Sequence, residues 1–262
     1  MNYKLAAIDL DGTLLNSQNR ISEATEAALK RLVEAGVVVA PATARWYQVA
    51  VRPFERMGLD VGAITCGGAD VRAPGGQVLA EKPLPGEFVP FIADLCDRAG
   101  WVTTLSSATR TYRRESELPP WASQAPEWLT PVTHLRDADL ARLLTVIATV
   151  DPGDPYLQEL EPWAGRVSCH RAVSFQGEEM VTLTAPAVDK GTGLLALCEA
   201  LGIDTSEAVA IGDSEVDVPM FEVAGLAVAM GNATPEAKAA AAMVTGTAEE
   251  DGVAEAIRRI WG

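Results

Sequence analysis

The sequence predicts an α/β fold, with a Rossmann-like open parallel sheet core and an inserted smaller α/β cap domain. Short apolar runs alternate with amphipathic helical segments in the first and last thirds of the chain. The middle third breaks this rhythm and is rich in proline. Hydrophobic residues make up 48% of the chain and aromatic residues only 6%, which is typical of helices packed on a buried sheet.

The pattern of the first third of the chain predicts a strand, a helix and a second, parallel strand joined by a right-handed crossover, followed by a hairpin. Residues 5–10 form an apolar run that stops at Asp11-Gly12, as a buried parallel strand stops at a sheet edge. Ser22 is expected to cap a helix that ends at Gly36, with an inward stripe of Ala24, Ala27, Ala28, Leu32 and Ala35. The other expected elements are a strand at 37–40, a helix at 46–57, a strand at 62–65 and a hairpin at 69–72 and 78–81.

The middle third predicts a domain inserted into the first. It mixes helical stretches with short strands at 101–105, 146–150 and 181–184. The αβ rhythm returns with a helix at 190–201, strands at 208–211 and 226–228, a loop through Pro219, and helices that start near Pro235 and Gly252. We therefore expect a core of residues 1–84 and 186–262 and an insertion of residues 85–185.

Charge and cysteine content exclude several classes of protein. The chain has 21 Lys and Arg against 36 Asp and Glu, a formal charge of -15, which disfavours binding to nucleic acid or an anionic membrane. Its basic cluster, Arg110, Arg113 and Arg114, is interpreted as a solvated strand face. No run is apolar and long enough for a signal peptide or a membrane span, and four widely spaced cysteines in apolar or mixed stretches indicate buried thiols in a reduced, cytoplasmic protein. The oligomeric state stays open.

Polar side chains follow the expected strands at the edge where open α/β sheets bind ligands. Asp9 and Asp11 are two residues apart, so in an extended chain both carboxylates would point to one site. They would share a divalent cation, or one would stay protonated, although Asp11-Gly12 alone is equally typical of a tight turn. Lys190 is expected in the first turn of a helix, where the helix dipole opposes a cation by roughly 0.3 to 1 kcal/mol, so neutralising a phosphate explains its position better.

Four segments together resemble the haloacid dehalogenase superfamily of phosphotransferases. Asp9 lies in DLDGTLL, Thr43 in PATAR, Lys190 in VDKGTG, and Asp213 and Asp217 in GDSEVD, in the order of the family's four motifs. The large insertion and the strings DKGTGL, AMGNA and EDGVAEAI resemble the Cof-type branch, subfamily IIB. Three positions depart from the family pattern: Ala44 in place of Gly, Gly67 in place of Asn, and Val216 in place of Asn.

The resemblance implies a phosphatase mechanism. Asp9 would be the nucleophile that forms a phospho-aspartate, and Asp11 the general acid and then base. Mg2+ would be held by Asp9, Asp213 and the backbone carbonyl of Asp11, with Asp217 in or near its outer shell. Residues expected to bind phosphate are Leu10, Asp11, Gly12, Thr43, Ala44, Arg45 and Lys190.

The expected substrate is a small phosphorylated metabolite, with a sugar phosphate favoured. The insertion is expected to close over the site and to select the leaving group. Trp121, Trp128 and Trp163 are expected in its core rather than stacked on substrate. Two alternatives stay open: a phosphotransferase or mutase that uses the same aspartyl phosphate, and a noncatalytic sensor of a phosphorylated metabolite.

Overall fold

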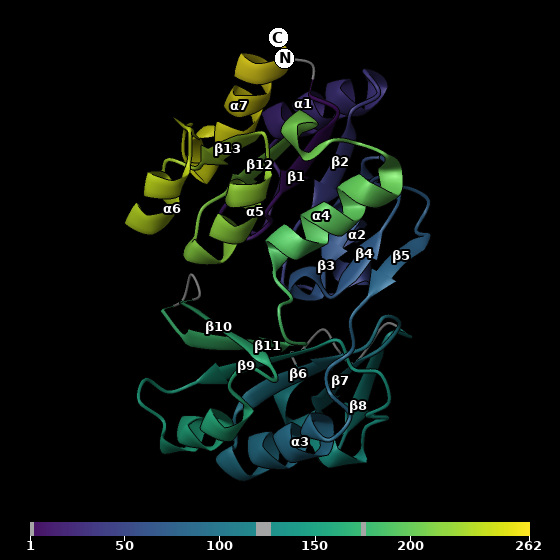
Figure 1. Cartoon of the computed structure of the whole chain (residues 1–262), viewed down its shortest axis with the longest axis vertical. Helices are drawn as coiled ribbons and strands as arrows, with labels where there is room; N and C mark the ends of the chain where they lie inside the picture. Colours follow the sequence, from purple (N-terminus) through teal and green to yellow (C-terminus); the bar gives the residue numbers. More distant parts are fainter. Residues whose placement is uncertain (1–2, 119–126, 174–176) are drawn as a thin grey trace. The chain divides into compact units, whose positions relative to one another are not determined.

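The computed structural model describes residues 3–118, 127–173 and 177–262 of the chain. The chain forms two compact units (Figure 1). The core unit contains the chain up to Ala80 together with Asp189–Gly262, and the inserted unit contains Glu81–Val188. These boundaries lie a few residues from the expected ones at 84/85 and 185/186.

A five-stranded parallel sheet forms the centre of the core unit, in the order β14-β13-β12-β1-β2. All four residues of β1 are fully buried, which is why this strand reads as an unbroken apolar run. The strands are β1 (Leu5–Ile8), β2 (Val38–Pro41), β12 (Ala208–Gly212), β13 (Leu226–Ala229) and β14 (Met243–Val244).

The helices cover both faces of this sheet because the chain runs outward from its centre in two directions. From β1 to β2 it crosses through α1 (Glu23–Glu34), and from β12 to β13 it crosses the opposite way through α5 (Val218–Val223). Right-handed crossovers therefore place α1 and α5 on opposite faces. Helix α4 (Lys190–Leu201) packs against α5, and α7 (Gly252–Trp261) packs against α1 (Figure 1). The reversal lies between β1 and β12, where open sheets bind ligands.

A smaller sheet follows β2 in the chain and has the order β3-β4-β5. Its strands are β3 (Ala63–Thr65), β4 (Asp70–Arg72) and β5 (Val78–Glu81), and α2 (Tyr47–Arg56) precedes them. The N–H of Thr43 donates to the carbonyl of Ile64 at 2.9 Å, so the segment after β2 is joined to β3. The last short helix, α6 (Pro235–Ala240), begins at the expected Pro235.

Two expectations for the core unit were wrong. The buried residues of α1 are Thr25, Ala28, Leu29 and Leu32, whereas Ala24, Ala27 and Ala35 are exposed. Alanine suits either face of a helix, so the larger Leu29 decides the orientation. The segment through Pro219 is not a loop but the first turn of α5, where proline is well tolerated because its missing N–H would have no helical partner.

The inserted unit packs α3 (Phe88–Ala99) and several 3-10 turns on a six-stranded sheet, in the order β10-β11-β9-β6-β7-β8. Trp163 belongs to its packing, with ring centroids 4.9 Å from Phe88, as expected. Trp121 lies outside the described residues. The strands are β6 (Val102–Ser106), β7 (Thr111–Arg114), β8 (Leu129–Val132), β9 (Thr145–Val150), β10 (Ser168–Val173) and β11 (Glu179–Thr184).

Two further expectations failed in this unit. Arg114 does not lie on a solvated face: it is buried and forms ion pairs with Asp97 and Glu117. Cys169 is exposed, while Cys66, Cys96 and Cys198 are buried. Cys169 lies in β10, which has a neighbouring strand on one side only, so its side chain is less covered than in an inner strand.

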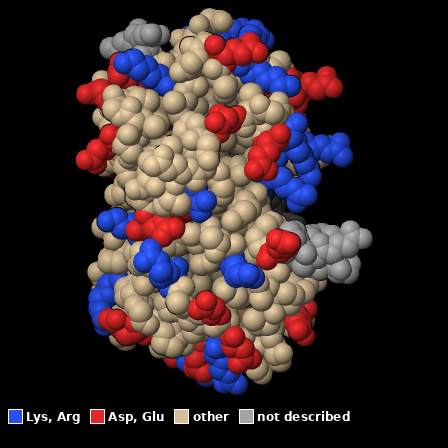
Figure 2. Space-filling model, turned by 90° about the vertical axis from the view of Figure 1, so that its right-hand side faces the viewer, with Lys and Arg blue, Asp and Glu red and all other residues tan. Residues whose placement is uncertain are grey.

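No helix among the described residues has the length and apolar character needed to cross a membrane. On the face shown in Figure 2, acidic and basic side chains are distributed among uncharged surface. Other charged side chains, among them Asp9, Lys190 and Asp217, are buried inside the core unit.

Candidate active site

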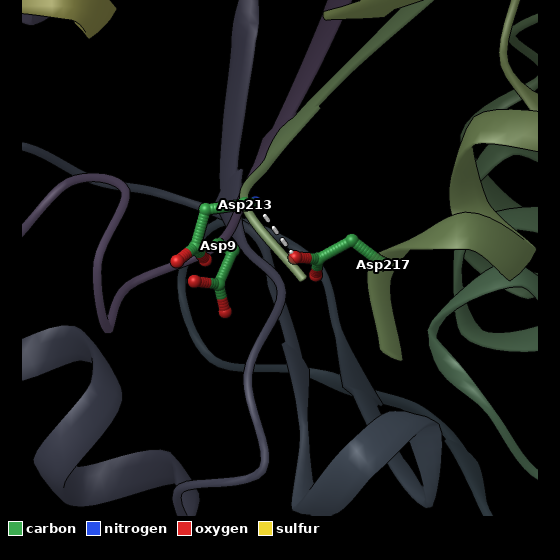
Figure 3. A group of neighbouring side chains, drawn as sticks. All are labelled: Asp9, Asp213 and Asp217. Atoms are coloured by element: carbon green, nitrogen blue, oxygen red, sulfur yellow. Dashed lines mark hydrogen bonds between the residues drawn. The ribbon is translucent and has the colours of Figure 1, made fainter. Parts of the chain in front are cut away.

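Three carboxylates gather where β1 and β12 end. Asp9 directly follows β1, and its N–H donates to the carbonyl of Ile211 in β12 at 2.9 Å. Asp213 directly follows β12, and its carboxylate lies beside that of Asp9 (Figure 3). Asp217 comes from the 3-10 turn just before α5. One oxygen of each carboxylate lies within 4.8 Å of the others, so the three can surround one cation.

Lys190 places a positive charge in this group. Its Nζ lies 2.6 Å from Oδ1 of Asp9 and 2.6 Å from Oδ1 of Asp217, and its side chain is only 6% exposed. Glycines allow α4 to start so close to the site: a Cβ on Gly68 would lie 2.1 Å from the carbonyl oxygen of Asp189. Within DKGTG itself, a Cβ on Gly191 would lie 2.4 Å from the carbonyl oxygen of Pro219, and one on Gly193 would lie 2.5 Å from Cγ2 of Ile64, so close packing explains both glycines of this string.

Asp217 is held firmly by its surroundings. Its Oδ2 accepts the N–H of Asp213 at 2.9 Å, the N–H of Ser214 at 3.0 Å and the hydroxyl of Ser214 at 3.2 Å, while Oδ1 accepts Lys190. A Cβ on Gly212 would lie 2.4 Å from Cγ of Asp217, so only glycine fits there. Both oxygens are already engaged, which suits a residue that orders the site more than a direct metal ligand.

The electrostatics of the group are unbalanced. Burial raises the pKa of Asp9 well above its usual range, Lys190 counteracts this, and Asp217 and Asp213 raise it further. Burial and then Asp217 raise the pKa of Asp213 to about 7. Burial lowers the pKa of Lys190, but Asp217 and Asp9 outweigh burial and raise it. Three carboxylates face one ammonium group, and an all-oxygen donor set with excess negative charge fits a hard divalent cation such as Mg2+.

Asp11 is not one of the three carboxylates that lie within 4.8 Å of one another, but its charge contributes to raising the pKa of Asp9 and of Asp213. The strand ends at Ile8 and the loop turns at Gly12, which has φ 85°, so the chain does not continue extended through Asp11 as expected. Instead, Asp11 forms a two-point ion pair with Arg45, whose Nε donates to Oδ2 at 2.8 Å and whose Nη2 contacts Oδ1. Nη2 also lies 3.4 Å from Oδ1 of Asn19.

The remaining expected phosphate-binding residues lie on the loops that follow β1 and β2. The Thr43 hydroxyl accepts the N–H of Arg45 at 3.2 Å, which leaves its own proton to donate. Thr43 is 1% exposed. Leu10 is fully buried, so its side chain is structural and only its backbone can contribute to binding. Ala44 lies between Thr43 and Arg45 in the same loop.

Two polar residues contact this site that the sequence reasoning did not single out. The hydroxyl of Thr13 donates to Oδ1 of Asp213 at 3.1 Å. The amide Nδ2 of Asn232 donates to the carbonyl of Gly12 at 2.8 Å and lies 3.5 Å from Oδ2 of Asp213. Both residues lie in strings that already carried the family resemblance, DLDGTLL and AMGNA, so the signal was present but assigned to no role.

Comparison with known proteins decides the family. A family model described as haloacid dehalogenase-like hydrolase matches residues 6–257. The chain belongs to the haloacid dehalogenase-like hydrolases. Within this family the chain is a phosphatase, and the predicted α/β fold class is confirmed.

Relatives of this haloacid dehalogenase-like phosphatase match it over nearly their whole length. A 5-amino-6-(5-phospho-D-ribitylamino)uracil phosphatase of Bacillus subtilis is 29% identical over 98% of this chain and 96% of its own. A phosphoglycolate phosphatase of Methanothermobacter thermautotrophicus is 30% identical over 98% of both chains. The solved structure of a subclass IIB sugar phosphatase shares the fold, with a TM-score of 0.82 over 98% of both chains at 23% identity.

Proposed function

We propose that this haloacid dehalogenase-like phosphatase is an Mg2+-dependent phosphomonoester hydrolase that forms a phospho-aspartate on Asp9. One observation carries the proposal: the buried carboxylate of Asp9 lies at the strand reversal, 2.6 Å from the ammonium of Lys190 and beside Asp213. The carboxylate is thus located where a phosphoryl group can be neutralised from several sides.

Asp9 has an oxygen available for the attack. Its Oδ1 accepts Lys190, and among the described residues no donor hydrogen-bonds to Oδ2. A carboxylate oxygen forms a bond to phosphorus while the bond from phosphorus to the ester oxygen breaks, and the leaving oxygen takes a proton from Asp11. Water then attacks phosphorus, Asp11 takes a proton from it, and phosphate leaves with Asp9 restored.

Asp11 needs a change of partner for this role. The ion pair with Arg45 occupies both of its oxygens, so neither can deliver a proton to a leaving group. A phosphate ester that enters the site offers Arg45 a competing anion. We infer that substrate binding separates the pair, so that Arg45 binds phosphate and Asp11 reaches the ester oxygen.

The residues around Asp9 suit the metal and the phosphate. Asp9, Asp213 and the backbone carbonyl of Asp11 would hold Mg2+, with Asp217 ordering the group from outside. Bound there, Mg2+ supplies positive charge against the phosphoryl oxygens. Lys190, the Thr43 hydroxyl and Arg45 complete the phosphate contacts, together with backbone N–H groups of Leu10, Asp11, Gly12 and Ala44.

The substrate in this proposal is a small phosphorylated metabolite, with a sugar phosphate favoured, and the inserted unit selects the leaving group. The names of the Bacillus and Methanothermobacter relatives support a small substrate, since one acts on a phosphorylated ribityl compound and the other on phosphoglycolate. The two substrates differ widely outside the phosphate. Specificity is therefore expected in the inserted unit rather than around Asp9.

A panel of phosphate esters with Mg2+ tests the function. The wild-type protein should release inorganic phosphate, and Asp9→Asn should lower kcat by roughly 10⁴-fold or more while keeping its circular dichroism spectrum. Acid quenching during turnover of a 32P-labelled ester should trap label on the wild-type protein and not on Asp9→Asn. Unchanged turnover by this variant would exclude Asp9 as the nucleophile.

The same panel separates the two alternatives. Turnover that depends on an added acceptor sugar would indicate a phosphotransferase or mutase. Binding of esters with no turnover at any Mg2+ concentration would indicate a sensor.

A further inference from the structure

We propose that Asn232 is a positioning residue for the metal: it fixes Asp213 and the loop after β1 in the arrangement that a divalent cation requires. This inference rests on the proposed function, because that function supplies the metal. It assigns a role to a residue that lies on neither β1 nor β12 and outside the four motifs that predicted the site.

The side-chain amide of Asn232 connects three segments. Nδ2 donates to the carbonyl of Gly12 at 2.8 Å and lies 3.5 Å from Oδ2 of Asp213. Oδ1 accepts the N–H of Ala248 at 2.9 Å. Both ends of the amide are therefore used, and the group cannot rotate without losing a contact. The backbone reinforces this position, since the N–H of Thr234 donates to the carbonyl of Asp213 at 2.8 Å.

The contact with Gly12 has a consequence for the neighbouring carbonyl. In the loop after β1, the carbonyl of Asp9 accepts Leu14 and that of Leu10 accepts Leu15, while that of Gly12 accepts Asn232. Among the described residues, no donor hydrogen-bonds to the carbonyl oxygen of Asp11. By holding the peptide of Gly12, Asn232 leaves the Asp11 carbonyl as the loop oxygen available to a cation.

The contact with Asp213 acts on the other ligand. The hydroxyl of Thr13 donates to Oδ1 of Asp213 at 3.1 Å, and the amide of Asn232 lies beside Oδ2. The carboxylate is thus bounded by a donor on each oxygen. Thr13 and Gly12 belong to the same loop, so Asn232 fixes the loop and the carboxylate relative to each other. Partners that orient metal ligands in this way typically change metal affinity by roughly 10- to 100-fold when removed.

The experiment measures Mg2+ binding to the full chain without substrate. Isothermal titration calorimetry should show a dissociation constant raised by roughly 10- to 100-fold in Asn232→Ala. Steady-state kinetics of Asn232→Ala should show the same defect. The Mg2+ concentration that gives half-maximal rate should rise, and kcat should recover toward the wild-type value as the Mg2+ concentration is raised. A general loss of structure would not recover with Mg2+.

Glu249→Gln is the matched control. Glu249 accepts the N–H of Ser17 at 2.6 Å and so connects the loop after β1 to the segment that contains Ala248, without contacting Gly12 or Asp213. Its Mg2+ dissociation constant should change by less than about threefold. An equal rise in both variants, or an unchanged constant in Asn232→Ala, would overturn the role of Asn232. If Asn232→Ala does not fold, Asn232→Ser provides the same measurement.

Asp213→Asn separates this inference from the proposed function. Loss of Mg2+ binding in Asp213→Asn supports the metal site on which both depend. Wild-type Mg2+ binding in that variant would overturn the metal site itself, whereas a normal constant in Asn232→Ala alone would leave the proposed function intact.

Discussion

Lys190 in the core unit and Arg114 in the inserted unit are both buried cations held by carboxylates, yet their surroundings differ. Arg114 donates to Asp97 at 2.9 Å, to Glu117 at 2.7 Å and to the carbonyl of Cys96 at 3.2 Å. Its partners are engaged as well, since Asp97 also accepts backbone N–H groups and Glu117 accepts that of Thr103. Charge and hydrogen bonding in this cluster are matched within the protein.

The cluster around Lys190 is not matched. Lys190 pairs with Asp9 and Asp217, and Asp213 adds a third carboxylate that no described cation contacts directly. Burial raises the pKa of Asp9 and of Asp213, which shows that holding their charge costs free energy. A cluster that is satisfied by the protein alone stabilises the fold, whereas one with excess charge is prepared for a ligand.

The largest effect on stability is therefore expected in the inserted unit. Arg114→Met removes the cation and leaves Asp97 and Glu117, whose side chains are only 10% and 11% exposed, without it, so the free energy of unfolding should fall by about 3 to 5 kcal/mol. Urea denaturation followed by the fluorescence of the tryptophans measures this change. Arg98→Met is the control, because Arg98 pairs with Asp94 and Glu159 at the surface and its loss should change stability little.

Equal stability of Arg114→Met and the wild-type protein would contradict the structural role of this cluster. It would also remove the basis for the comparison, since the cluster around Arg114 would then not stabilise the fold.

Arg45 provides a third case, an ion pair that is partly exposed and that we expect to serve binding rather than stability. Its pair with Asp11 lies in the core unit, with side chains 29% and 43% exposed, so Arg45→Met should lower stability by less than about 1 kcal/mol. Because Arg45 is proposed to bind phosphate, kcat/KM for an ester should fall by roughly 10- to 100-fold, which is about 1.4 to 2.8 kcal/mol. Steady-state kinetics and urea denaturation of the same variant give both numbers.

Arg45→Lys tests the geometry of the contact. Lysine keeps the charge but loses the planar two-point donor, so an intermediate kcat/KM is expected. A large loss of stability with unchanged kinetics in Arg45→Met would instead place this pair with the structural cluster of Arg114.

The sequence predicted the parts of this arrangement that follow from strand ends and motif order. Asp9 and Asp213 end neighbouring parallel strands, and Lys190 begins a helix where a cation is unfavourable without a partner. These local signals are sufficient because the carboxyl ends of parallel strands meet at one edge. The helix predicted at 190–201 has these bounds in the structure, where Asp189 caps its start and Gly202 follows its end.

The sequence could not predict contacts that depend on tertiary packing. The pairing of Asp11 with Arg45 requires the turn at Gly12, which an extended interpretation of the first motif overlooks. The burial of Arg114 depends on Asp97 from α3, a contact between distant segments that no local alternation indicates. Asn232 contacts Gly12 across 220 sequence positions, so its string could be recognised but its partner could not.

A pH-dependent change in stability is expected at Asp213. Its pKa is about 7 in the folded protein against an ordinary value of 3.8 for an aspartate carboxyl group, so the folded state favours the protonated form. That contribution to stability is complete below about pH 3.8 and is lost as pH rises through about 7.

Asp213→Asn carries no charge at any pH, so without Mg2+ its Tm should exceed the wild-type Tm by an amount that grows from pH 5 to pH 8. Each kcal/mol of difference in the free energy of unfolding should raise Tm by roughly 2 to 4 °C. Added Mg2+ should reverse the order at pH 8, because only the wild-type protein gains binding free energy. Differential scanning calorimetry with EDTA and with Mg2+ measures both, and a difference in Tm that does not vary with pH would show that Asp213 is not destabilised by its buried charge.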